Sequence, residues 1–66
     1  MTVTINDKTV MVQPMTTLDR LMADNGINPA GTAVAVNGTV VTPTQWPATM
    51  LRDGDAILVF KAFYGG

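Results

Sequence analysis

The chain has 66 residues, of which 47% are hydrophobic and 14% are charged, and its formal net charge is −1. This length suits one small domain, and this apolar content excludes intrinsic disorder. The few Lys and Arg residues are scattered along the chain, so no basic stripe predicts nucleic acid as a partner. Cysteine is absent, which excludes disulfides and cysteine-ligated zinc.

Chemically reactive side chains are few. The sequence contains no His, Ser or Glu, which removes imidazole acid–base catalysis, a serine nucleophile and His-containing metal sites. We therefore expect a protein that is not itself an enzyme and binds no cofactor or metal. The longest apolar run, at 56–60, is too short to span a membrane, and no signal peptide is visible. The expected compartment is the cytoplasm, with no membrane partner.

Two β-strands are predicted first, at 2–5 and 9–13. Both alternate β-branched or apolar residues with polar ones, and turn-forming residues separate them. A two-residue loop at Asp7-Lys8 would place the four apolar side chains of the hairpin on one face of the sheet. The pairs expected from this loop are Ile5 with Val10 and Val3 with Val12.

A short helix is predicted after Pro14. Thr16 is the expected N-cap, and Asn25-Gly26 ends the helix after about nine residues. Its apolar side chains recur at i, i+3 and i+4 and form one stripe, which we expect to pack on the sheet. The stripe consists of Leu18, Leu21 and Met22. The sheet residues expected beneath it are Val3, Ile5, Val34, Val36, Ile57 and Val59.

A second hairpin is predicted around Asn37-Gly38, because both residues tolerate the positive φ of a tight turn. Trp46, between two prolines, is expected in a helical turn or loop where it closes the edge of the core. The strand pairs expected from the hairpin are Val34 with Val41, Ala35 with Val40 and Val36 with Thr39.

The last predicted strand runs from Ala56 to about Phe63 and is apolar at nearly every position. Continuous apolarity is typical of a central strand, and a helical crossover would make it parallel to the first strand. Leu58 and Phe60 are then expected on the sheet face away from the helix, near Val40. A polar face would be usual there, so we expect a partner-binding surface rather than scattered exposed apolar residues.

The turn before this strand is Asp53-Gly54-Asp55, and the chain ends in Tyr64-Gly65-Gly66. The two carboxylates of the turn either bond to nearby backbone or contact basic residues of a partner. A terminal diglycine by itself would suit a frayed end, whereas a diglycine after a buried central strand indicates a functional tail.

The whole chain resembles the sulfur carrier proteins of thiamine biosynthesis, the ThiS family. The residues that carry this resemblance are Val36-Asn37, Gln45-Trp46, Asp53-Gly54-Asp55, Ile57, Phe60 and Gly65-Gly66. The resemblance implies an α+β fold of the β-grasp (ubiquitin-like) type: a mixed five-stranded sheet with one main helix packed on one face. It implies a single domain over 1–66 with a flexible tail at about 64–66.

The resemblance also implies a function for the tail. A partner adenylating enzyme, similar to E1 enzymes, would use ATP to adenylate the Gly66 carboxylate. A sulfur donor, either a cysteine desulfurase or a sulfurtransferase, would convert it to a thiocarboxylate, which would donate sulfur to a thiazole synthase. Gly65 lacks a Cβ and Tyr64 is bulky where similar carriers have a small residue, so Gly65 would thread a narrow channel and Tyr64 would rest at its mouth.

Two alternatives to this function remain open. The molybdopterin synthase small subunit is a related sulfur carrier, although its members are usually somewhat longer. A non-covalent ubiquitin-like interaction module would need no free diglycine and would tolerate its loss.

Overall fold

The computed structural model describes residues 1–61; residues 62–66, including the last part of the predicted final strand, lie outside the described residues. The elements along the chain are β1 (Thr2–Ile5), β2 (Lys8–Met11), α1 (Leu18–Asp24), β3 (Thr32–Val36), β4 (Thr39–Val41), the 3-10 helix η1 (Pro43–Ala48) and β5 (Ala56–Lys61). No helix within residues 1–61 is long and apolar enough to cross a membrane.

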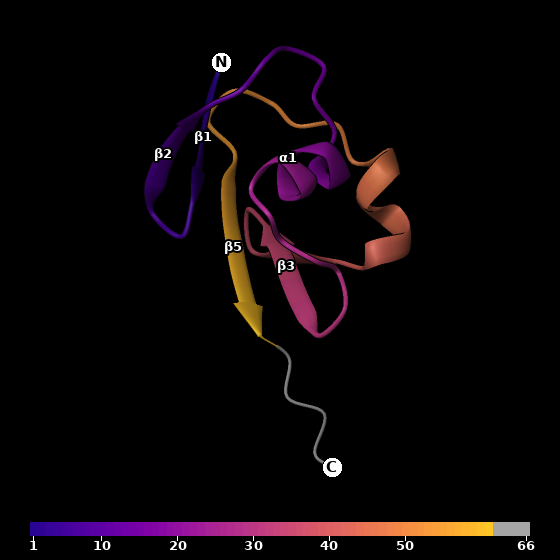
Figure 1. Ribbon diagram of the computed structural model, residues 1–66. Coiled ribbons are helices and arrows are strands. Elements are labelled where there is room, and N and C mark those ends of the chain that lie inside the picture. The colour runs from indigo at the N-terminus through magenta and orange to yellow at the C-terminus, as the bar shows by residue number, and fades with distance from the viewer. Residues whose placement is uncertain (62–66) are drawn as a thin grey trace.

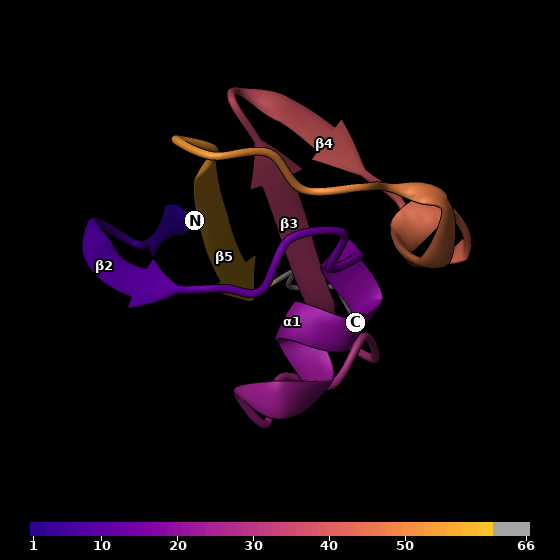
Figure 2. The ribbon, with the colours of Figure 1, turned by 90° about the horizontal axis from the view of Figure 1, so that it is seen from above.

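The strands form one five-stranded mixed sheet in the order β2-β1-β5-β3-β4. β5 is central, as its continuous apolarity predicts, and it runs parallel to β1 with Ile57 beside Ile5. On its other side β5 is antiparallel to β3. Helix α1 lies across one face of this sheet, and η1 lies beside the helix (Figures 1 and 2). The predicted β-grasp arrangement, with one main helix on one face, is confirmed.

The core lies between α1 and the sheet, where the predicted apolar stripe of the helix is buried. Leu18 and Met22 are fully buried and Leu21 is 4% exposed. Trp46 of η1 closes one edge of the core, as expected, and its indole N–H donates to the carbonyl of Val41 at 2.9 Å. The buried cluster consists of Val3, Leu18, Leu21, Met22, Val34, Trp46, Leu51 and Ile57.

The predicted start of the helix is wrong by one residue, because the N-cap is Thr17 and not Thr16. The carbonyl of Thr16 accepts the N–H of Leu51 at 3.0 Å, and Leu18 donates to Thr49 at 2.8 Å. This pairing with a distant loop holds Thr17 in an extended conformation, so the helix has 7 residues rather than about nine.

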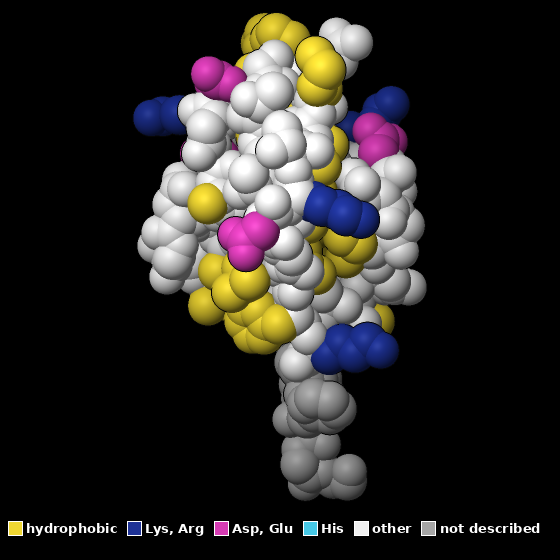
Figure 3. Space-filling model, turned by 90° about the vertical axis from the view of Figure 1, so that its left-hand side faces the viewer, with side chains coloured by type: hydrophobic (Ala, Val, Ile, Leu, Met, Phe, Trp, Pro, Cys, Tyr) yellow, Lys and Arg dark blue, Asp and Glu magenta, His cyan; other side chains and the backbone are white. Residues whose placement is uncertain are grey.

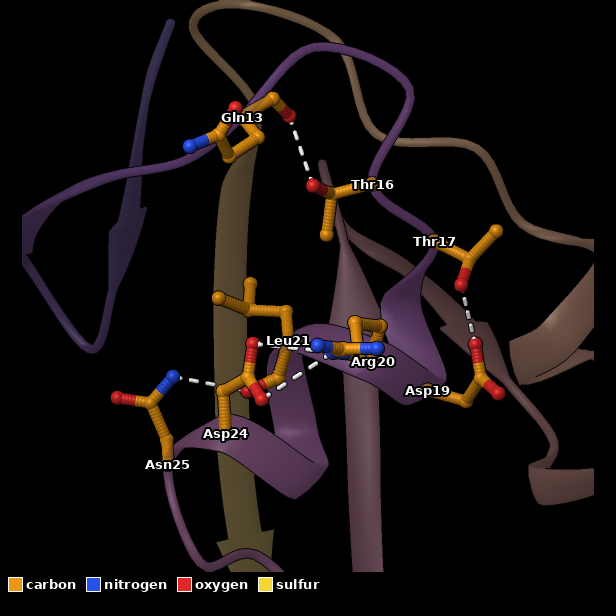
Figure 4. A network of polar contacts seen from close by, with 8 residues as sticks. All are labelled: Gln13, Thr16, Thr17, Asp19, Arg20, Leu21, Asp24 and Asn25. Atoms are coloured by element: carbon orange, nitrogen blue, oxygen red, sulfur yellow. Dashed lines mark hydrogen bonds and ion pairs between the residues drawn. The ribbon is translucent and has the colours of Figure 1, made fainter.

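The polar side chains at the ends of α1 form local contacts (Figure 4). The Thr17 hydroxyl donates to the Asp19 carboxylate, and Arg20 forms an exposed ion pair with Asp24 at 3.3 Å. At the other end, the Asn25 side chain donates to the carbonyl of Leu21 at 2.8 Å, and Gly26 has the positive φ expected after a helix.

The predicted register of the first hairpin is also wrong. The turn lies at Asn6-Asp7, with φ values of 49° and 69°, and not at Asp7-Lys8. Both residue types tolerate the left-handed conformation that a two-residue turn requires, which selects this loop. Val3 therefore pairs with Val10. The error is two residues, so each side chain keeps its predicted face and Val10 still packs against the core.

The second hairpin has the predicted register. Val34 pairs with Val41, Ala35 with Val40 and Val36 with Thr39. Its turn at Asn37-Gly38 has φ values of 51° and 85°, which explains why this dipeptide gave a reliable prediction.

Candidate functional site

The sheet face away from α1 carries exposed apolar side chains from β5 and β4. Leu58 is 54% exposed, Phe60 is 42% exposed and Val40 is 61% exposed, while Ala35 between the two strands is only 6% exposed. We call these four residues the open face. The orientation that the sequence predicts for Leu58, Phe60 and Val40 is thus observed.

The strand register explains why these side chains form one patch. Ala35 of β3 is paired with Leu58 on one side and with Val40 on the other. Its methyl group leaves room for both larger neighbours, so Leu58 and Val40 flank a small central residue. Phe60 extends the patch along β5 beside Ala33. Hydrophobic side chains gather at the surface in the lower part of the view in Figure 3. Apolar patches of this kind are typical of protein interaction sites.

β5 connects the open face to the end of the chain. The strand runs from the end of the sheet near the N-terminus to the opposite end, where its last residue is Lys61 (Figure 1). The other predicted site residues, Tyr64, Gly65 and Gly66, lie outside the described residues. The described part therefore places the open face immediately before the tail in the sequence.

Two asparagine side chains from turns hold the backbone of β5. Asn37 accepts the N–H of Ala56 at 2.9 Å, at the start of the strand. Asn6 bonds to both the N–H and the carbonyl of Val59, near its end. From the sequence, both residues were expected in turns, and a contact with β5 was predicted for neither. The bonds of Asn6 to β5 span 53 residues, and no local pattern reveals such a contact.

The carboxylates of the turn before β5 bind the chain itself. Asp53 Oδ1 accepts the N–H of Thr2 at 2.8 Å. Asp55 is buried, and its oxygens accept the Asn37 amide at 2.9 Å and the Arg52 N–H at 2.8 Å. The predicted bonding to nearby backbone is confirmed for Asp55, whose partner Arg52 is three residues away. Asp53 instead bonds to Thr2 of β1, a contact between distant segments that the sequence did not predict. In residues 1–61, no three His, Cys, Asp or Glu side chains are grouped so that they could hold a metal ion.

The chain is similar to known proteins over its full length. The ThiS family model matches residues 2–66. The sulfur carrier protein ThiS of Escherichia coli (strain K12) is 32% identical over 66 residues, which cover 100% of both chains.

Two solved structures have the same fold. The crystal structure of the thiamine biosynthesis protein ThiS from Geobacter metallireducens has a TM-score of 0.85 and 28% identity, with 100% of this chain and 99% of that chain covered. An NMR structure of a thiamine biosynthesis protein from Geobacter metallireducens has a TM-score of 0.75 and 29% identity, covering 100% of this chain and 88% of that chain. The chain therefore belongs to the ThiS family of sulfur carrier proteins of thiamine biosynthesis.

Proposed function

We propose that this chain carries sulfur as a thiocarboxylate on Gly66 and supplies it for thiazole formation. The observation that carries the proposal is the match to the Escherichia coli sulfur carrier over 100% of both chains, which includes the terminal diglycine of this sequence. The fold adds a physical reason, because the strand that precedes the tail in the sequence, β5, is anchored in the centre of the sheet.

The proposed chemistry activates a poor electrophile. An oxygen of the Gly66 carboxylate attacks the α-phosphorus of ATP in the partner enzyme, and pyrophosphate leaves. A persulfide sulfur from the donor, a cysteine desulfurase or a sulfurtransferase, then attacks the acyl carbon and AMP leaves. A thiol cleaves the resulting sulfur–sulfur bond, which frees the thiocarboxylate for the thiazole synthase.

In this proposal the partners supply the catalytic groups, and this chain supplies the reactive end and a docking surface. The open face is the proposed surface, since Leu58, Phe60 and Val40 are apolar and exposed, and Leu58 and Phe60 precede the tail by a few residues in the sequence. Gly65 would enter the channel of the adenylating enzyme, and Tyr64 would rest at its mouth. The cytoplasm is the proposed compartment because adenylation consumes ATP.

ATP–pyrophosphate exchange with purified adenylating enzymes tests the proposal. We expect exchange with the enzyme of thiamine biosynthesis that requires an intact Gly66, and slower exchange with the enzyme of molybdopterin biosynthesis. The family match and the similarity to the thiamine biosynthesis proteins of Escherichia coli and Geobacter metallireducens support this preference. Absence of exchange with either enzyme, combined with partner binding that survives deletion of Gly66, would instead indicate a non-covalent interaction module.

A further inference from the structure

The Asn6 side chain supports the part of β5 that carries the open face. Its Oδ1 accepts the backbone N–H of Val59 at 2.8 Å, and its Nδ2 donates to the Val59 carbonyl at 3.2 Å. One side-chain amide thus supplies the acceptor and the donor that a neighbouring strand would supply. Val59 lies between Leu58 and Phe60, so the residue that Asn6 holds joins the two open-face residues of β5.

This support begins where β1 ends. The last pair between the two strands is Ile5 with Ile57, and the Asn6 N–H donates to the Ile57 carbonyl at 2.9 Å. The chain then turns back at Asn6-Asp7, whereas β5 continues to Lys61. In the part of the chain that the structure describes, the Asn6 side chain supplies the hydrogen bonds on the β1 side of β5 beyond Ile57.

We infer that Asn6 is a positioning residue for docking of the open face on the adenylating enzyme, an inference that rests on the proposed function. Its amide fixes the end of β5 against β1, and thereby the placement of Leu58 and Phe60. Both hydrogen bonds are exposed to solvent, so water can replace them when the amide is removed. Removal of the amide therefore impairs docking more than folding.

The variant Asn6→Gly removes this amide and keeps the turn, because glycine readily adopts the positive φ of residue 6. Asp7→Gly is the matched control. Asp7 is exposed, has a φ of 69° in the same turn, and forms no side-chain hydrogen bond within residues 1–61. Asn6→Asp is a second variant that keeps the acceptor for the Val59 N–H and replaces the donor.

The first readout is ATP–pyrophosphate exchange, measured on chains shown to be folded by circular dichroism. For Asn6→Gly we expect KM for the carrier to rise roughly tenfold with kcat changed less than about twofold, because lost docking raises KM alone. We expect an intermediate KM for Asn6→Asp. For Asp7→Gly we expect both constants within about twofold of wild type.

The second readout is amide hydrogen exchange, which does not depend on the partner. Exchange at Val59 is expected to accelerate in Asn6→Gly and to stay unchanged in Asp7→Gly, while the buried Val34 amide exchanges equally in both. Unchanged exchange at Val59 would overturn the role of the amide. If wild type is adenylated but the Asn6 variants match Asp7→Gly in KM, positioning is refuted. If the wild-type chain itself is not adenylated, the proposed function fails, and the positioning role of Asn6 in docking fails with it.

Discussion

Replacement of Leu21 by alanine tests the packing of α1 on the sheet. Leu21 is 4% exposed and belongs to the core cluster. Loss of its branched end removes roughly 2–2.5 kcal/mol of transfer free energy, and the cavity left behind raises the total to about 3–4 kcal/mol. A domain of this length has a free energy of unfolding of roughly 3–10 kcal/mol, so this substitution removes a large part of it.

Urea and thermal denaturation followed by circular dichroism measure this loss. At about 3 kcal/mol, the midpoint temperature is expected to fall by roughly 12–24 °C. Leu58→Ala is the matched control, because it makes the same chemical change at a side chain that is 54% exposed. The control should lose less than about 1 kcal/mol. Equal losses in the two variants would refute the assignment of Leu21 to the core and Leu58 to the open face.

Two further substitutions test the proposed contacts with the adenylating enzyme. Phe60→Asp is expected to keep the circular dichroism spectrum and to raise KM for adenylation at least roughly tenfold, because a charge replaces an apolar contact. Thr44→Asp in η1 is the control. An unfolded Phe60→Asp chain would contradict the exposed position of Phe60. Tyr64→Ala is expected to lower kcat/KM for adenylation several-fold if the ring rests at the channel mouth, and unchanged kinetics would show that the ring makes no such contact.

The sequence was sufficient to predict the order of the elements along the chain, the central place of β5 and the faces of its side chains. These features depend on patterns that repeat along the chain. Alternation sets the face of each residue in a strand, and helical spacing sets the buried stripe of α1. Asn37-Gly38 defines its turn because both residues must take a positive φ, so the second hairpin register followed directly.

The features that the sequence did not predict depend on contacts between distant segments or on a choice between similar turns. The predicted loop at Asp7-Lys8 is displaced by one at Asn6-Asp7, whose two residues both tolerate the positive φ that they adopt. The helix begins late because Thr16 pairs with the loop at Leu51. The support of Val59 by Asn6 joins opposite ends of the chain and has no local signature.

Sulfur transfer to Gly66 is tested most directly by the intact mass of the chain after incubation with its adenylating enzyme, ATP and sulfur donor. We expect the chain to gain the mass difference of one oxygen-to-sulfur exchange, located on the C-terminal fragment, only when ATP is present. Deletion of Gly66, or extension by one residue, should prevent the gain because adenylation requires a tightly positioned carboxylate. A wild-type chain that keeps its original mass, while the Escherichia coli carrier gains sulfur with its own enzymes, would contradict the proposed function.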